Sequence, residues 1–215
     1  MARRLIATTV MSFALCALFA LAASAAPPRG SYQYTITRNG DAIGTHRTEL
    51  RARGDRLVVQ HDVDIRVQIA GWEAYRYRLS SSEFWDGDRL TRLTAHTNKN
   101  GTPLAVMARA ADRHIEIRGA NEARASLEAV PASPAWNVLE RRPRTMIDAE
   151  NGETLSVRVG EPRAATIRAA GRSVACRCYR VAGELSADLC YRADGVLVRK
   201  RLRAPDGSTV VELLR

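Results

Sequence analysis

The sequence predicts an all-β protein: a single antiparallel meander of about a dozen strands, curled into a barrel or half-barrel. Apolar and polar residues alternate with a period of two along most of the chain after residue 26, which is typical of half-buried strands. Turn signals rich in Gly, Asn and Asp separate these segments at short intervals. No helical pattern is long enough for a crossover between parallel strands, so we expect antiparallel pairing.

The clearest strand signal lies in residues 56–69, where apolar residues from Leu57 to Ile69 share one face. Asn39-Gly40-Asp41 predicts a tight hairpin turn earlier in the chain, and Ala70-Gly71-Trp72 predicts a three-residue connection after this strand. The expected strands are, in order, residues 31–38, 42–53, 56–69, a segment ending at Trp85, 89–97, 103–109, 113–118, 144–149, 154–159, 164–169, 173–182, 188–193, 196–203 and 208–214.

One segment, residues 119–143, interrupts the alternation. It contains Pro131, Pro134 and Pro143, and an Ala-rich run at residues 122–129. Proline cannot donate to a β-ladder, and alanine favours helix. We therefore expect a loop with short helical turns between residues 120 and 142, which caps an open end of the sheet.

The first residues have the pattern of a secretory signal peptide. Arg3 and Arg4 precede an apolar run from Leu5 to Leu21, and Ala23-Ser24-Ala25 supplies small residues for cleavage after Ala25. This pattern predicts a periplasmic or secreted protein in which residues 1–25 are the signal and residues 26–215 form a single β domain. An uncleaved anchor is the alternative, and no second long apolar run predicts a membrane-spanning helix after it.

The net charge does not indicate nucleic-acid binding. Of the 33 basic residues only two lie in the leader, and all 23 acidic residues lie after it, so the remainder keeps a charge of +8. The basic residues are scattered among acidic ones and are nearly all arginine; the two lysines are Lys99 and Lys200. No basic stretch is interleaved with aromatic residues, which argues against a nucleic-acid partner.

Three cysteines follow the leader: Cys176, Cys178 and Cys190. In an oxidising compartment two of them are expected to pair. A hairpin through Gly183-Glu184-Leu185 places Cys190 opposite one of the other two, at a cross-strand distance that suits a disulfide. We favour Cys178–Cys190, with Cys176–Cys190 as the alternative. Three thiols without a nearby histidine make a poor zinc signature, so no metal site is expected.

Two polar residues lie on apolar strand faces. His61 is in phase with Val59 and Val63, and Glu83 is in phase with Trp85. The expected register sets residue 63 opposite 79 and residue 59 opposite 83, so that His61 and Glu83 become diagonal neighbours. Two interpretations stay open. One is a polar anchor for a ligand inside an apolar cavity. The other is structural: a satisfied core pair, or a Glu83 that accepts from backbone and from Trp136.

Four further residues complete the set of ligand-binding candidates: His46, Trp85, Trp136 and Asn137. His46 follows Gly44, and a glycine inside a strand suggests a bulge or a close backbone approach. No H-x-H, H-E-x-x-H or G-x-S-x-G motif, P-loop or dinucleotide fingerprint occurs in the sequence. No catalytic residue, cofactor or metal is therefore predicted.

Five short pieces occur in order along the sequence: Asn39-Gly40-Asp41-Ala42-Ile43-Gly44-Thr45-His46, Glu83-Phe84-Trp85-Asp86-Gly87, Ala135-Trp136-Asn137, Leu189-Cys190-Tyr191-Arg192-Ala193-Asp194-Gly195 and Asp206-Gly207-Ser208. Together they resemble an uncharacterised family of secreted bacterial β proteins, a family defined by a domain of unknown function. The pieces span nearly the whole chain after the leader, and their order carries the resemblance. The resemblance implies one domain with a curved β architecture, and it implies no activity.

From these observations we expect a periplasmic, non-catalytic protein that binds an apolar or amphipathic ligand, such as a lipid, inside a curved sheet. One alternative is a structural or interaction module of the cell envelope, with a filled core and an envelope protein as partner. A second alternative is an enzyme that uses His61 or His46 with Glu83. Fold class alone does not choose among these functions.

Overall fold

Sixteen strands form one large, mostly antiparallel sheet in the computed structural model, which describes residues 28–204 and 206–215. The predicted signal peptide, residues 1–25, lies outside the described residues. No helix in the described part of the chain is long and apolar enough to cross a membrane. The first eight strands are β1 (Gly30–Arg38), β2 (Asp41–Arg53), β3 (Arg56–Ile69), β4 (Trp72–Asp86), β5 (Arg89–Lys99), β6 (Thr102–Ala110), β7 (Ile115–Arg118) and β8 (Glu122–Ala125).

The second half of the chain contains shorter strands and one turn of 3-10 helix, η1 (Leu139–Arg141). The predicted all-β class is confirmed, and η1 is the helical turn expected between residues 120 and 142. The remaining strands are β9 (Val130–Pro131), β10 (Thr145–Ile147), β11 (Thr154–Val159), β12 (Arg163–Ala169), β13 (Arg172–Gly183), β14 (Ala187–Tyr191), β15 (Leu197–Arg203) and β16 (Thr209–Leu214).

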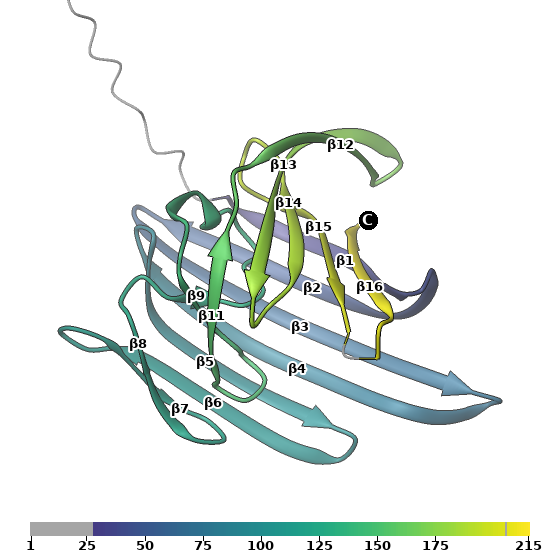
Figure 1. Ribbon diagram of the computed structural model, residues 1–215, viewed down its shortest axis with the longest axis horizontal. Helices are drawn as coiled ribbons and strands as arrows, with labels where there is room; N and C mark the ends of the chain where they lie inside the picture. Colours follow the sequence, from purple (N-terminus) through teal and green to yellow (C-terminus); the bar gives the residue numbers. More distant parts are fainter. Residues whose placement is uncertain (1–27, 205) are drawn as a thin grey trace, which may run out of the picture.

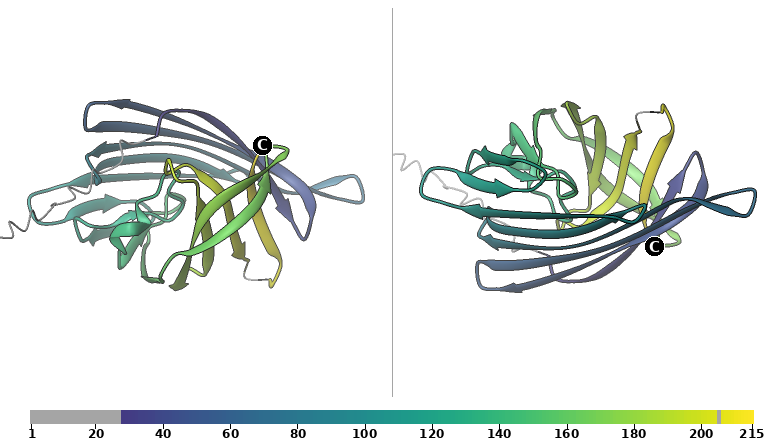
Figure 2. Two further views of the ribbon diagram at one scale, coloured as in Figure 1. Left: turned by 90° about the horizontal axis from the view of Figure 1, so that it is seen from above. Right: turned by 90° about the horizontal axis from the view of Figure 1, so that it is seen from below.

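The strands are ordered β8-β7-β6-β5-β4-β3-β2-β1-β16-β15-β14-β13-β11-β10-β9, and β12 pairs with β13 beside this path. Strands β1 and β16 join the two halves, through partners such as Tyr34 and Leu214. The sheet folds back at this junction, so that the long strands β2–β6 form one wall and β13–β16 form the other (Figures 1 and 2). Tyr34 on β1 donates a hydrogen bond to the carbonyl of Leu197 on β15 across the interior.

The sheet is not a closed barrel, because its path ends at the two edge strands β8 and β9. The two ends still approach each other at one point. The Ala120 N–H donates to the Asn151 carbonyl at 2.8 Å. Gly119 permits this approach, since a Cβ there would lie 2.2 Å from the same carbonyl oxygen.

Three details differ from the expected meander. Residues 122–125 form strand β8 instead of helix, because β7 offers them an antiparallel partner that outweighs the helical preference of alanine. Strand β9 pairs in parallel with β10, which the intervening loop of about a dozen residues permits. The turn after β3 is the two-residue Ala70-Gly71, and a bulge in β4 restores the register that a three-residue connection would give.

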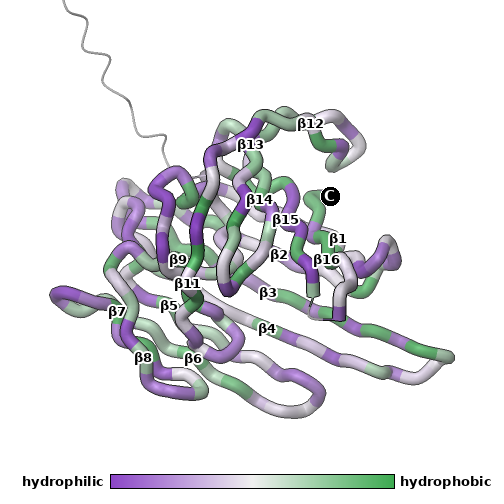
Figure 3. The backbone as a smooth tube through the Cα atoms, viewed as in Figure 1, coloured by the Kyte–Doolittle hydropathy of each residue, from purple (hydrophilic) through white to green (hydrophobic). Residues whose placement is uncertain are grey.

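The alternation that predicted the strands also builds the core. Hydrophilic and hydrophobic residues alternate along the long strands (Figure 3). The inward set packs between the two walls and includes Leu57, Leu93, Ile117 and Tyr179, each at most 1 % exposed. Burial of such side chains contributes about 1.5–3 kcal/mol each. Toward one side of this core the apolar packing gives way to buried polar groups.

Candidate functional site

A row of buried hydrogen bonds joins four titratable side chains on the inner face of the sheet. Glu212 on β16 pairs with Nδ1 of His46 on β2. His46 Nε2 lies 2.9 Å from Nδ1 of His61 on β3. His61 Nε2 lies 3.1 Å from Oε1 of Glu83 on β4. All four residues are at most 7 % exposed, and we call this set the His–Glu chain.

Strand alternation brings these residues together. Val59 and His61 are both buried on the inward face of β3, and Glu83 and Trp85 are both buried on that of β4. The register places Val59 opposite Glu83, which makes His61 a diagonal neighbour of Glu83 as predicted. Beside them, His46 projects from the same face of β2.

Gly44 has no side chain, which allows β2 to approach β3 closely two residues before His46. A Cβ at Gly44 would lie 2.3 Å from the carbonyl oxygen of Asp64. The register between β1 and β2 also shifts here, because Ile43 is an extra residue between two paired positions. Both consequences expected of this glycine, a bulge and a close backbone approach, are confirmed.

The hydrogen bonds fix how many protons the His–Glu chain holds. Its three bonds each need one proton, whereas two carboxylates and two neutral imidazoles supply only two. A third proton is required, and it leaves the four groups with a net charge of −1. Burial raises the pKa of Glu212, but the charge and hydrogen bond of His46 outweigh burial and lower it to about 2. Glu212 is therefore ionised at neutral pH.

Neighbouring aromatic residues hold the His–Glu chain at both ends. Trp85 Nε1 donates to Oε2 of Glu83 at 2.9 Å, so both oxygens of this carboxylate have partners. The ring of Tyr34 packs against that of His46 at 5.4 Å between centroids. Burial raises the pKa of Tyr34 well above its usual range, so its hydroxyl remains a donor.

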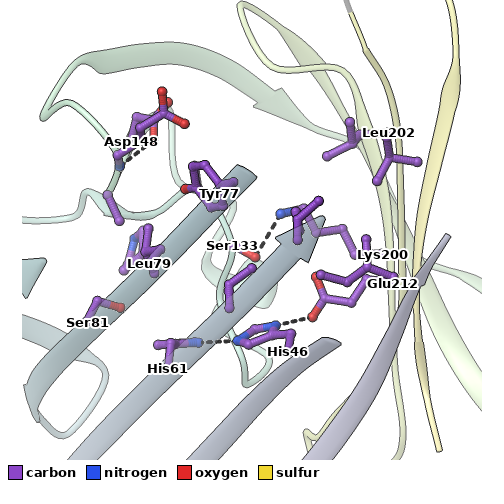
Figure 4. A pocket seen from close by; sticks show the side chains of 18 of the residues that line it. His46, His61, Tyr77, Leu79, Ser81, Ser133, Asp148, Lys200, Leu202 and Glu212 are labelled. Atoms are coloured by element: carbon purple, nitrogen blue, oxygen red, sulfur yellow. Dashed lines mark hydrogen bonds and ion pairs between the residues drawn. The ribbon is translucent and has the colours of Figure 1, made fainter. Parts of the chain in front are cut away.

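The His–Glu chain lines one side of a cavity of about 370 Å³ between the two walls (Figure 4). This volume falls within the range of about 300–1,000 Å³ that is usual for small-molecule sites. Most of the other lining side chains are apolar and come from both walls and the loop between β9 and β10. They include Ile36, Val63, Ile65, Leu79, Leu155, Leu185, Leu202 and Val210.

A few further polar groups face the same cavity. Lys200 on β15 donates from Nζ to Oγ of Ser133 at 2.8 Å, as Figure 4 shows. Asp148 is partly exposed, and burial raises the pKa of its carboxyl group. Glu150 is bound by Lys99 on β5, whose Nζ lies 2.7 Å from Oε1. The polar lining thus contains charges of both signs.

The structure brings three of the predicted site residues, His46, His61 and Glu83, to the cavity lining. Trp85 lies behind Glu83 as its hydrogen-bond donor and not in the lining of this cavity. The expectation that Trp136 donates to Glu83 is wrong, because Trp85, two residues along the same strand face, occupies that position. The hydrogen bonds agree with the interpretation of a satisfied core pair, because both His61 nitrogens and both Glu83 carboxylate oxygens have internal partners.

The loop residues Trp136 and Asn137 lie outside the lining of this cavity. Trp136 packs edge-on against Trp85 at 5.3 Å, and its Nε1 has no partner in the described part of the chain. Asn137 Nδ2 lies 3.2 Å from the hydroxyl of Tyr179 and the same distance from the carboxylate of Glu140. Both residues therefore fix the loop against the sheet.

Sequence reasoning missed Glu212 and Lys200. Glu212 carries the same signal that identified Glu83, since it is in phase with Val210 and Leu214 on the inward face of β16. Its pairing with His46 depends on the contact between β16 and β1, two strands that are separated by most of the chain. Lys200 carries the same signal, since it is in phase with Val198 and Leu202, whereas Arg201 and Arg203 are exposed on the other face of β15.

The favoured disulfide is confirmed and the alternative Cys176–Cys190 is wrong. Cys178 on β13 lies directly opposite Cys190 on β14, and the two form the bond. Cys176 is a free, buried thiol whose pKa is raised by burial.

The arrangement offers no evident metal cage. Among residues 28–204 and 206–215, no group of three His, Cys, Asp or Glu is placed to hold a metal ion. The four imidazole nitrogens of His46 and His61 are already engaged with each other and with the two carboxylates.

Comparison with known proteins identifies a family for the chain but gives no activity. No curated protein is a match for the chain. A family model described as Domain of unknown function (DUF6134) matches residues 34–215, which include every strand from the end of β1 to β16 and all four members of the His–Glu chain. The resemblance to a domain of unknown function is thereby confirmed, and the chain belongs to the DUF6134 family.

Proposed function

We propose that this protein is a non-catalytic binding protein that holds an apolar or amphipathic ligand, such as a lipid, between the two walls of its sheet. The observation that carries the proposal is the cavity of about 370 Å³, with mostly apolar sides and the His–Glu chain along one side. A structural module with a filled core would not contain a cavity of this size. Such a combination of apolar walls and a few placed polar groups is typical of ligand sites.

We further propose that the protein works outside the cytoplasm, after removal of residues 1–25. The signal pattern supports export. The disulfide between Cys178 and Cys190 fits an oxidising compartment. A lipid-like ligand dissolves poorly in water, so a protein must shield it in an aqueous compartment outside the cytoplasm.

The geometry gives less support to an enzyme. His61 and Glu83 lie within hydrogen-bond reach, as an acid–base pair requires. However, each imidazole nitrogen already has an internal partner, so proton transfer to a substrate would first break a bond of the chain. The hydrogen bonds therefore favour a binding role.

A cavity-filling substitution tests the proposal. Val63 lines the cavity opposite His46 in the β2–β3 register, so Val63→Phe occupies ligand space. Val58→Phe makes the same change on the opposite face of β3 and serves as the control. Native mass spectrometry of protein purified with its own leader, followed by lipid extraction, should find a bound species in the wild type and Val58→Phe. Its loss in Val63→Phe is expected, and absence of any bound molecule from the wild type would contradict the proposal.

A further inference from the structure

Two side chains of opposite charge line the cavity side by side without bonding to each other. Lys200 on β15 and Glu212 on β16 are direct partners in the strand register. Lys200 donates one N–H to Ser133, and Glu212 accepts through Oε1 from His46. Within the described residues no ion pair joins the ammonium group to the carboxylate, although both line the cavity. Donors on Nζ and an acceptor, Oε2, are therefore left for a guest molecule.

The charges of the His–Glu chain and of Lys200 offset each other. The His–Glu chain carries −1, because its three hydrogen bonds require three protons. Lys200 contributes +1, and the pair formed by Lys99 and Glu150 adds no net charge. Asp148, a partly exposed residue of the lining, adds one negative charge that has no such offset when it is ionised. A ligand carboxylate would face the carboxylates of Glu212 and Asp148, and a ligand ammonium would face Lys200. Either ion would pair with Lys200 or with Glu212 but would lie beside a like charge, which an uncharged headgroup avoids.

We propose that the cavity selects an amphipathic ligand with an uncharged headgroup that both accepts and donates a hydrogen bond, a hydroxyl being the smallest such group. This inference rests on the proposed ligand-binding function. The hydroxyl oxygen accepts from Nζ of Lys200, and its proton is donated to Oε2 of Glu212. The hydrocarbon part then lies against Val63, Leu79 and the other apolar lining residues.

Three ligands that share one alkyl chain test this selectivity: 1-decanol, decanoate and decylammonium. Binding is measured by titration calorimetry at pH 7 with delipidated protein. Because hydrogen bonds to charged groups are strong, we expect decanol to bind about tenfold more tightly than either ion. The methyl ether of decanol, which accepts but cannot donate, should lose most of that advantage.

Two variants distinguish the effect of the Lys200 charge from that of an exposed charge beside it. Lys200→Met removes the donor and leaves the cavity negative, so decanol binding should weaken about tenfold and decylammonium should become the preferred ligand. Arg201→Met, at the next position of β15 on its exposed face, is the matched control and should leave the order of the three ligands unchanged. Circular dichroism verifies that both variants are folded, and Lys200 is half-buried, so its loss is tolerated.

The outcomes are distinct. Tightest binding of decanoate or of decylammonium to the wild type would overturn the headgroup inference and leave the binding function in place. Equal binding of decanol to the wild type and to Lys200→Met would overturn it as well. Failure of all three ligands and of the ether to bind would instead count against the proposed function.

Discussion

Glu212→Gln is the sharpest test of the His–Glu chain, because it removes one negative charge and almost no volume. The Glu212 side chain is 9 % exposed, and the pKa of its carboxyl group falls from the ordinary 4.5 to about 2 because the charge and hydrogen bond of His46 outweigh the effect of burial. At about 1.36 kcal/mol per pH unit, this difference corresponds to about 3 kcal/mol of stability at neutral pH. A domain of ordinary stability, about 5–15 kcal/mol, remains folded after such a loss.

The pH dependence distinguishes this effect from a simple packing defect. The folded-state pKa of Glu212 lies below its unfolded value, so the stabilisation is complete above about pH 4.5 and is lost as the pH falls toward about 2. Urea unfolding, followed by the fluorescence of the buried Trp85 and Trp136, gives the free energy of unfolding at each pH. Wild type and Glu212→Gln should differ by about 3 kcal/mol at pH 7 and converge near pH 2.

Glu161→Gln provides the matched control. Glu161 also pairs with a cation, Arg142, but its side chain is 73 % exposed. An exposed pair contributes little, so this variant should stay within about 0.5 kcal/mol of the wild type at every pH. A difference between Glu212→Gln and the wild type that is the same at pH 7 and at pH 2 would refute the linkage between Glu212 and His46.

The remaining predictions concern the scaffold. The double variant Cys178→Ala, Cys190→Ala removes a disulfide between residues that are 12 positions apart in the sequence. Its free energy of unfolding in urea should fall by about 3 kcal/mol. An unchanged urea midpoint would show that the purified protein lacks this disulfide. Gly44→Ala should lose more than about 1 kcal/mol, because its Cβ meets backbone at 2.3 Å. Gly160→Ala, whose Cβ meets its nearest atom at an ordinary 3.5 Å, should be nearly neutral, and equal thermal shifts of the two variants would contradict the close approach at Gly44.

Local pairing explains why part of the site was accessible from the sequence. Strands β3 and β4 are adjacent in the chain, and their alternation and short turn determine which residues face each other. The register that places Val59 opposite Glu83 was therefore predicted correctly, even though the turn has two residues and a bulge supplies the difference. His61 and Glu83 follow from that register.

Non-local pairing explains what the sequence did not reveal. Glu212 reaches His46 only because β16 pairs with β1 after the intervening chain has folded back. Period-two alternation identifies the inward face of β16 but not the strand beside it. Lys200 is likewise in phase with apolar residues, Val198 and Leu202, but its position at the cavity depends on how β15 folds over the other wall. The cavity itself depends on the spacing of the two walls, which no single strand encodes.

Stability alone gives no reason for the His–Glu chain. Apolar side chains of similar volume in place of a buried ionic network are often neutral or stabilising, since they avoid the cost of removing charges from water. Leu and Phe at the positions of His46, His61 and Glu83 would pack against Leu57 and Val59 without that cost. Such a core, however, could not position a carboxylate at the cavity wall opposite a lysine. The polar chain holds Glu212 ionised and fixed while leaving one of its oxygens free, which is the arrangement that the proposed ligand site requires.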